Sequence, residues 1–218
     1  MTNDRINMKL EAKNVLKNSG SVFYVMTFLI VLVSAASAIP VIGLLAVIAD
    51  FFLAFVFVKN SLKVIKGEFV DFNTFFDFTG WKTYLKGMAW TLLYMLLYMI
   101  PLYLFAFIFG IGIAKPNTFL IIFGILGMIA SYIFLFYKMF DFILVPYLAC
   151  DNQEATGKEL VAISREKMQG HKIEYLVLEL SFILWILLGA VTCGIAYLYV
   201  MPYMQLTVSI WYNCLMKN

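Results

Sequence analysis

Charged residues are scarce in this sequence, and histidine and cysteine are scarcer still. Asp, Glu, Lys and Arg make up 13% of the 218 residues, whereas soluble domains hold about 25%. The single histidine, His171, rules out a site built from several histidines. The 3 cysteines, Cys150, Cys193 and Cys214, show none of the spacings of zinc sites or disulfide frameworks. The sequence therefore predicts no metal site and no cofactor.

Signatures of catalysis and of nucleic-acid binding are missing as well. The sequence contains no GxSxG, Walker or HExxH motif and no Cys/His pair spaced for catalysis. His171 has no evident partner that would make it a catalytic base. The lysines and arginines are spread along the boundaries of apolar stretches, whereas nucleic-acid binding calls for one basic patch. We therefore expect neither an enzyme nor a nucleic-acid-binding protein.

Apolar sequence, in contrast, is abundant. Hydrophobic residues make up 63% of the chain and aromatic residues 17%, and the mean hydropathy is +0.90. An α-helix rises about 1.5 Å per residue, so about 20 apolar residues cross a hydrocarbon core of about 30 Å. The composition predicts an all-α membrane protein in contact with membrane lipids, with residues 1–218 forming a single transmembrane domain.

Six stretches are predicted as membrane spans. Pro101 should bend the third span, and the fourth is longer than a bilayer requires, so it should tilt or bend near Pro146. The prolines could mark broken helices that line a path, or they could simply bend the spans. The predicted spans are residues 21–39, 41–62, 82–113, 118–150, 173–191 and 195–214. The predicted turn and bend positions are Pro40, Pro101, Pro146, Gly170, Gly194 and Pro202.

Three more polar segments are predicted to lie at the membrane surface. Residues 1–19 alternate basic and apolar residues at helical spacing, which is typical of an amphipathic surface helix. A cleaved signal peptide is the alternative, because Ala36-Ser37-Ala38 resembles a cleavage site, but the long lead-in favours a retained anchor. In residues 67–81 we expect phenylalanines in the membrane surface and Asp71 and Asp77 in water. Residues 151–169 are predicted to form a solvated helix or, alternatively, a docking helix for a partner.

The positions of the basic residues predict the orientation of the spans. Among all lysines and arginines, only Lys115 falls in a segment that six spans would place on the outer side. Lysine and arginine are enriched in cytoplasmic loops. Both termini and the surface segments 67–81 and 151–169 are therefore predicted to lie on the cytoplasmic side.

A weak internal repeat accompanies this topology. Residues 80–85 (GWKTYL) resemble residues 170–176 (GHKIEYL) with one insertion, and residues 20–24 (GSVFY) form a looser third copy. Each copy follows an amphipathic segment and opens a span, which predicts three helical hairpins, each introduced by an interfacial helix. Shared interface chemistry, with glycine, lysine and an aromatic residue at a membrane boundary, explains the similarity equally well.

The last third of the chain carries a more specific pattern. It comprises Val145-Pro146-Tyr147, AISREKMQGHK at 162–172, LSFILW at 180–185, TCGI at 192–195 and Pro202-Tyr203. The pattern resembles the bacterial integral membrane proteins grouped as domain of unknown function 975, although Ser164 falls nearer to the isoleucine than in that family. The resemblance implies a multi-pass protein of the bacterial cytoplasmic membrane, and it implies no activity.

Ionisable residues inside the spans are the candidate functional residues, because charge is costly in a membrane. Asp50 falls near the middle of the second span, Glu179 lies in the fifth, and Glu174 lies at its inner rim. Lys138 and Asp141 share one helix face and could pair. If these five residues converge, they form an acidic cavity with one lysine, suited to a cation, a proton relay or an amine. The alternative is that each is paired within the bundle and has no further role.

Two functions remain open from the sequence. The first is a non-enzymatic membrane protein that handles a small solute, an ion or a lipid through a cavity in the helix bundle. The alternative is an accessory or immunity-type membrane protein that acts on an unidentified protein partner through its cytoplasmic interfacial helices. A water-accessible cavity that reaches Asp50 would favour the first function, and a dry, tightly packed bundle would favour the second.

Overall fold

The apolar stretches form helices, because a helix satisfies its own backbone N–H and C=O groups where water is absent. The computed structural model describes residues 2–39 and 42–217, which contain helices and turns and no β-strand, so the all-α prediction is confirmed. In chain order the elements are α1 (Thr2–Ala36), α2 (Gly43–Ile65), α3 (Phe72–Phe75), α4 (Trp81–Tyr98), α5 (Ile100–Ala114), α6 (Thr118–Met139), the 3₁₀ turn η1 (Phe140–Phe142), α7 (Val145–Asp151), α8 (Gly157–Lys167), α9 (Lys172–Leu180), α10 (Ile183–Val191) and α11 (Tyr197–Lys217).

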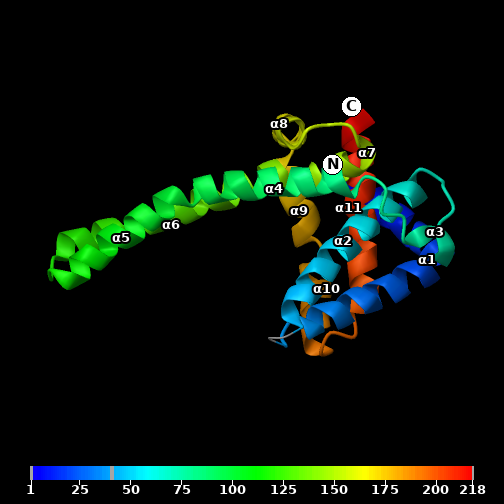
Figure 1. Ribbon diagram of the computed structural model, residues 1–218, viewed down its shortest axis with the longest axis horizontal. Coiled ribbons are helices and arrows are strands. Elements are labelled where there is room, and N and C mark those ends of the chain that lie inside the picture. The colour runs from blue at the N-terminus through cyan, green and yellow to red at the C-terminus, as the bar shows by residue number, and fades with distance from the viewer. Residues whose placement is uncertain (1, 40–41, 218) are drawn as a thin grey trace.

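The last helix, α11, runs through the middle of a helix bundle (Figure 1). It packs mainly against α1 and α2, and only lightly against α10, its neighbour in sequence. The side chains of Leu206, Ile210 and Trp211 are at most 3% exposed. Its small polar residues Thr207 and Ser209 are fully buried. A helix covered by other helices can carry polar residues, provided that they are hydrogen-bonded.

Four helical stretches are long and apolar enough to cross a membrane. The bent helix α1 makes a fifth candidate if its two halves, Asp4–Ser19 and Ser21–Ala36, which meet at 93°, count as one span. The predicted sixth span, residues 195–214, is helical as part of α11, but within the described chain it is not one of these candidates. Six spans are therefore not confirmed. The four stretches are Gly43–Ile65, Trp81–Ala114, Thr118–Asp151 and Lys172–Val191.

A long arm leaves the bundle, formed by α4 and α5 on one side and α6 on the other (Figure 1). The arm points in a different direction from α2, α10 and α11, so the predicted set of three equivalent hairpins is not confirmed. Large apolar side chains cover the outer surface of the arm. Those more than half exposed include Leu104, Phe107, Phe119, Leu126 and Ile133.

Glycines let the two sides of the arm approach closely. A Cβ atom added at Gly124 would lie 2.7 Å from the Cβ atom of Phe109 and 2.8 Å from its Cα atom. We therefore expect Gly124→Leu to force α5 and α6 apart and to cost about 1–3 kcal/mol, the usual penalty of overpacking. Gly110 is the matched control, because a Cβ atom there meets nothing within 4 Å. Thermal unfolding in neutral detergent should show a lower midpoint for Gly124→Leu and none of this loss for Gly110→Leu. Equal midpoints would contradict the close packing.

Proline and glycine interrupt or separate helices at four of the six predicted positions. Helix α4 ends at Tyr98, and Pro101 occupies the first turn of α5. A 3₁₀ turn separates α6 from α7, whose first turn holds Pro146. Gly170 and Gly194 have φ angles of +84° and +92°, which glycine adopts without strain. Two further predicted positions differ: Pro202 lies inside α11 without ending it, and Pro40 lies outside the described residues.

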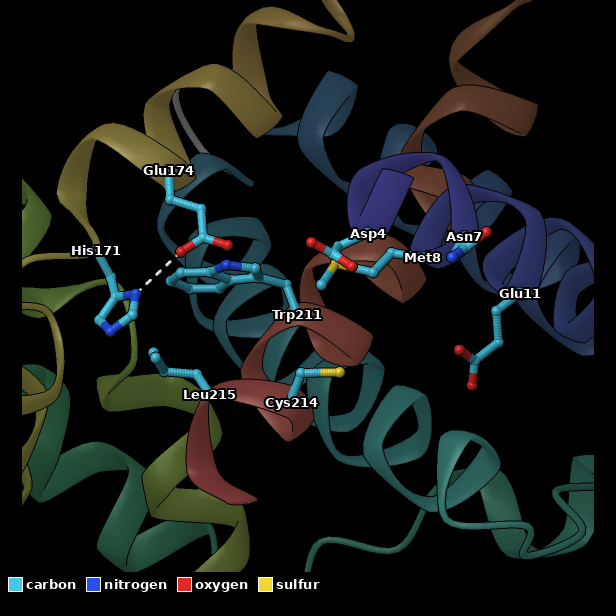
Figure 2. Close-up of a pocket in the computed structure, with 9 residues that line it drawn as sticks. All are labelled: Asp4, Asn7, Met8, Glu11, His171, Glu174, Trp211, Cys214 and Leu215. Carbon is cyan, nitrogen blue, oxygen red and sulfur yellow. Dashed lines mark hydrogen bonds and ion pairs between the residues drawn. The ribbon is translucent and has the colours of Figure 1, made fainter. Parts of the chain in front are cut away.

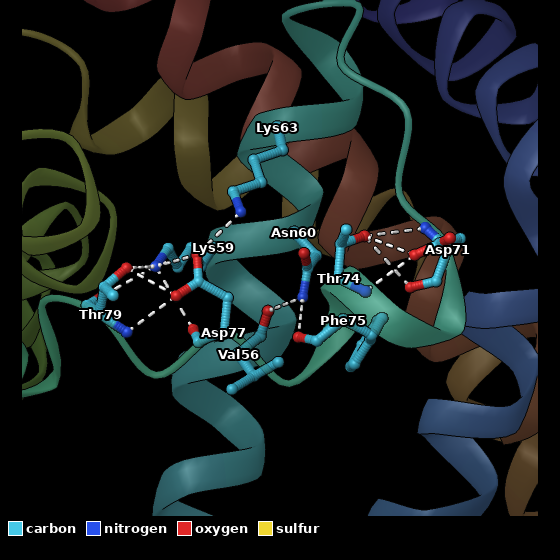
Figure 3. Close-up of polar contacts among 9 residues, drawn as sticks. All are labelled: Val56, Lys59, Asn60, Lys63, Asp71, Thr74, Phe75, Asp77 and Thr79. Atoms are coloured by element: carbon cyan, nitrogen blue, oxygen red, sulfur yellow. Dashed lines mark hydrogen bonds and ion pairs between the residues drawn. The ribbon is translucent and has the colours of Figure 1, made fainter.

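The segment between α2 and α4 is tied to α2 by buried polar contacts (Figure 3). The amide of Asn60, on α2, donates to the backbone carbonyl of Phe75 at 2.9 Å. The ammonium group of Lys59 donates to the carbonyl and hydroxyl oxygens of Thr79 at 2.7 and 2.6 Å. Lys59 can point into this segment because backbone and side-chain oxygens replace its water.

Asp77 does not lie free in water, which corrects the prediction for this segment. Its carboxylate forms ion pairs with Lys59 at 2.7 Å and with Lys63 at 3.0 Å (Figure 3). Burial by itself would raise the pKa of Asp77, but hydrogen bonds from Lys59, Thr79 and Lys63 hold this pKa well below its usual range. Asp77 is therefore a structural anion that secures the α2–α4 connection.

Candidate functional site

A cavity of about 480 Å³ lies between α2, the α9–α10 pair and α11. This volume falls within the range of about 300–1,000 Å³ that is typical of small-molecule sites. Most of the lining is aliphatic or aromatic, including Phe57, Ile186 and Met204. Glu179 is the one charged residue among the described residues that line the cavity. An apolar wall with few polar groups is the usual make-up of a ligand pocket.

Glu179 brings an ionisable carboxyl group to this apolar surface. It lies on α9 and is half-buried, and Tyr175, one helical turn earlier, also lines the cavity and donates a hydrogen bond from its hydroxyl to Glu179. Within the described chain, Glu179 forms no ion pair with a lysine or arginine, so it does not pair with Lys138. A carboxylate in such surroundings favours a ligand that supplies a positive charge or a hydrogen-bond donor.

A hydrogen-bonded network forms the polar part of the cavity wall. The amide nitrogen of Gln205, on α11, donates to the hydroxyl groups of Tyr147 and Ser61, each at 3.2 Å. The hydroxyl groups of Ser61 and Ser209 lie 2.8 Å apart. The network connects α2, α7 and α11, and it fixes the orientation of Gln205 next to the cavity. Gln205 was not predicted as a site residue from the sequence, although a glutamine and a serine at i and i+4 in a predicted span are a signal that could have identified it.

Asp50 lies close to this cavity but does not line it. The hydroxyl of Ser34, on α1, donates to one oxygen of its carboxyl group at 2.9 Å. The other oxygen, Oδ1, is buried and has no hydrogen-bond partner in the described part of the chain. Ala54 and Ile30, one turn away from Asp50 and Ser34 on the same helices, do line the cavity. Asp50 and Ser34 therefore sit one turn beyond its wall.

Lys138 and Asp141 form the predicted pair, and two more cations join it. Asp141 is only 2% exposed and accepts from Lys138 at 3.4 Å and from Lys172 at 2.5 Å. The Nε atom of Arg165 lies 4.0 Å from the same carboxylate. The hydroxyl of Ser164 donates to the backbone carbonyl of Asp141 at 2.7 Å. This cluster joins α6, η1, α8 and α9 where the arm meets the bundle.

Glu174 occupies a separate cleft at the end of the bundle (Figure 2). Its carboxylate lies 2.9 Å from Nδ1 of His171, so the histidine does have a partner, which corrects our expectation. The cleft has a volume of about 370 Å³, and the buried ring of Trp211 lies between α1 and the start of α9. Asp4 and Glu11, on α1, line the side opposite Glu174.

The five candidate residues therefore do not form one acidic cavity. Glu179 faces the bundle cavity, Asp50 lies one turn outside it, and Glu174 lines the cleft of Figure 2. Lys138 and Asp141 belong to an ionic cluster. Among the described residues, no group of three or more His, Cys, Asp or Glu side chains could hold a metal ion. Of the five candidates, only Glu179 lines the apolar cavity between α2, the α9–α10 pair and α11.

The described chain has an all-α fold, and several of its helices are long and apolar enough to span a membrane. The chain belongs to the family described as protein of unknown function (DUF975), whose model matches residues 1–218. The resemblance found in the last third of the sequence is thus confirmed over the whole chain. Comparison with curated proteins gave no match, and neither did comparison with solved structures.

Proposed function

We propose that this is a non-enzymatic, multi-pass protein of the bacterial cytoplasmic membrane that binds a small cationic amphiphile in the bundle cavity. The ligand class is an apolar body with a protonated amine or a similar donor head. Glu179 accepts the head, Gln205 and Tyr147 supply the neighbouring polar contacts, and the apolar wall takes the body. The observation that carries the proposal is the carboxylate of Glu179, which has no lysine or arginine partner in the described chain and lies in an apolar cavity of about 480 Å³.

The distribution of charge supports a cytoplasmic position for both ends of the chain. The start of α1 and the end of α11 line the same cleft, so they lie on one side of the bundle. Lys59, Lys63 and Lys66 lie toward the end of α2, and Lys66 reaches Asp151 at the end of α7. Basic residues gathered at one end of spanning helices favour the cytoplasmic side. This orientation remains part of the proposal.

The proposal predicts that Glu179→Gln weakens binding of a long-chain amine. Purified protein in non-ionic detergent is titrated with dodecylamine, and bound ligand is counted by native mass spectrometry. We expect the variant to lose at least about tenfold in affinity, because a hydrogen bond to a charged group contributes about 1.5–3 kcal/mol. Glu174→Gln, on the same helix but outside the cavity, should bind as the unaltered protein does.

Dodecanol is the matched uncharged ligand, because it shares the alkyl chain and lacks the amine. It should bind more weakly than dodecylamine and respond little to Glu179→Gln. If Glu179→Gln binds dodecylamine with unaltered affinity, the cavity does not recognise amines through this carboxylate. That result would favour the alternative function, an interaction protein. In that case α8 would bind a protein partner through its exposed residues Lys158, Glu159 and Glu166.

A further inference from the structure

The ionic cluster around Asp141 holds more positive than negative charge. Lys138, Arg165 and Lys172 surround one carboxylate, and both of its oxygens are occupied. Lys172 takes Oδ1, while Lys138 and Arg165 share Oδ2. Among the described residues, no second carboxylate pairs with any of these three cations. The cluster therefore keeps an excess of two positive charges.

Arg165 has an unused donor inside this cluster. Its terminal nitrogen donates to the hydroxyl of Tyr98 at 2.9 Å, and the guanidinium lies 5.1 Å from the ring centre of Tyr94. Its Nε atom is buried and lacks a hydrogen-bond partner in the described chain, since Asp141 at 4.0 Å is too distant. The side chain as a whole is 35% exposed, and the bond to Tyr98 uses only one of the N–H groups on the terminal nitrogens, so the guanidinium keeps donors for an acceptor from another molecule.

The cluster can be reached from outside the protein, and apolar side chains surround it. The side chains of Arg165 and Lys138 are 35% and 26% exposed. Tyr137, whose ring lies 3.6 Å from the ammonium of Lys172, is itself exposed, and so is Ile173. Cations beside exposed apolar side chains match a molecule with an anionic head and hydrocarbon tails, whereas a free anion would gain nothing from the apolar rim.

We infer that Lys138, Arg165 and Lys172 bind the phosphate headgroup of an anionic membrane lipid. The phosphate oxygens accept from the remaining terminal N–H groups of Arg165 and from the free donors of Lys138, and they offset the excess charge around Asp141. Planar guanidinium groups suit phosphate geometry, and a lysine adds a point charge. The inference rests on the membrane location proposed above, but not on the amine site at Glu179.

The test uses the full chain in neutral detergent with phosphatidylglycerol or phosphatidylcholine of the same acyl chains. Native mass spectrometry should show tighter binding of phosphatidylglycerol. Arg165→Gln and Lys138→Gln should each weaken it about fivefold, the effect of one cation near an anionic lipid. Lys158→Gln removes a charge from the other end of α8 and should change nothing. Glu179→Gln should also leave this binding unaltered, which separates this site from the amine site.

Three results would overturn the inference. One is equal affinity for the two lipids, and another is unaltered phosphatidylglycerol binding in both Arg165→Gln and Lys138→Gln. The third is a thermal unfolding midpoint that inorganic phosphate alone raises as much as phosphatidylglycerol does. The ligand would then be free phosphate. Each variant keeps Asp141 paired with at least one lysine, so the fold is expected to survive both substitutions.

Discussion

Asp141→Asn should lower the free energy of unfolding by about 3–5 kcal/mol, the usual cost of removing one partner from a buried ion pair. Asp141 is only 2% exposed and is the shared anion of Lys138, Arg165 and Lys172. With asparagine in its place, these cations repel one another, and Lys172, only 11% exposed, loses its closest partner. Because the cluster joins the arm to the bundle, the loss should affect global unfolding.

Asp151→Asn is the matched control for this prediction. Asp151 also pairs with a lysine, Lys66, at 2.5 Å, but the two side chains are 28% and 42% exposed. Its other oxygen accepts from the hydroxyl of Tyr212 at 2.9 Å, a bond that the amide oxygen of asparagine can also accept, so the variant loses only the ion pair. Exposed pairs contribute about 0–1 kcal/mol, so the control should lose little. Thermal and denaturant unfolding in neutral detergent measures both variants. Similar losses in the two would mean that the Asp141 cluster is no more important than a surface ion pair.

Helix breaks and tight turns could be predicted because they depend on the backbone preferences of single residues. Pro101 and Pro146 each occupy the first turn of a new helix. Gly80 directly precedes α4, and Gly170 lies two residues before the start of α9. Both adopt a left-handed conformation, with φ angles of +89° and +84°. The similarity of these two sequence segments therefore has a shared local cause, whether or not the hairpins that follow are equivalent.

The place of α11 could not be predicted, because it depends on helices that are distant in sequence. Residues 195–214 are predicted as a span from the sequence, yet α11 is not among the described helices that are long and apolar enough to be one. In the fold, α1 and α2 cover this helix, so its polar residues Gln205 and Ser209 bond within the bundle. Sequence periodicity shows that a helix has different faces, but it does not show which other helix covers each face.

For the same reason, only some contacts of the candidate site residues could be predicted from the sequence. The pair of Lys138 and Asp141 is local, at i and i+3, and was therefore predictable. Arg165 and Lys172 reach the same carboxylate only because α8 and the start of α9 fold back onto the end of α6. Glu179 was a candidate because it is an acid in an apolar span, whereas its cavity is created by three separate parts of the fold.

Asp77→Asn is expected to cost about 3 kcal/mol, at the lower end of the range for breaking a buried pair, since this aspartate is 30% exposed. The loss arises mainly at Lys59, whose side chain is 7% exposed and would keep its charge without a counter-ion. Lys63, 26% exposed, can turn toward water. Asp71→Asn is the control in the same segment, because Asp71 accepts from the backbone N–H of Thr74 and the amide oxygen of asparagine can accept the same capping bond, so this variant should lose less.

A double variant distinguishes the loss of the attraction between Lys59 and Asp77 from the cost of leaving Lys59 charged without a counter-ion. Lys59→Met combined with Asp77→Asn removes both charges, so it should recover most of the stability that Asp77→Asn loses. If the double variant is instead as unstable as the sum of the two single variants, Lys59 and Asp77 act independently, and the ion pair does not hold the α2–α4 segment. Unfolding midpoints of all four proteins complete the cycle.

The pH dependence of unfolding provides a second readout of Asp77. Its pKa in the folded protein lies below the ordinary value of 3.8, because its hydrogen bonds outweigh burial, so the unfolded chain binds a proton more readily than the folded one. The stability from this carboxylate is therefore fully present above that ordinary value and is lost as the pH falls through the lower, folded pKa. Asp77→Asn has no such proton to bind, so its deficit relative to the unaltered protein should shrink below about pH 4. A deficit that stays constant across this range would show that the carboxylate charge is not what secures the segment to Lys59.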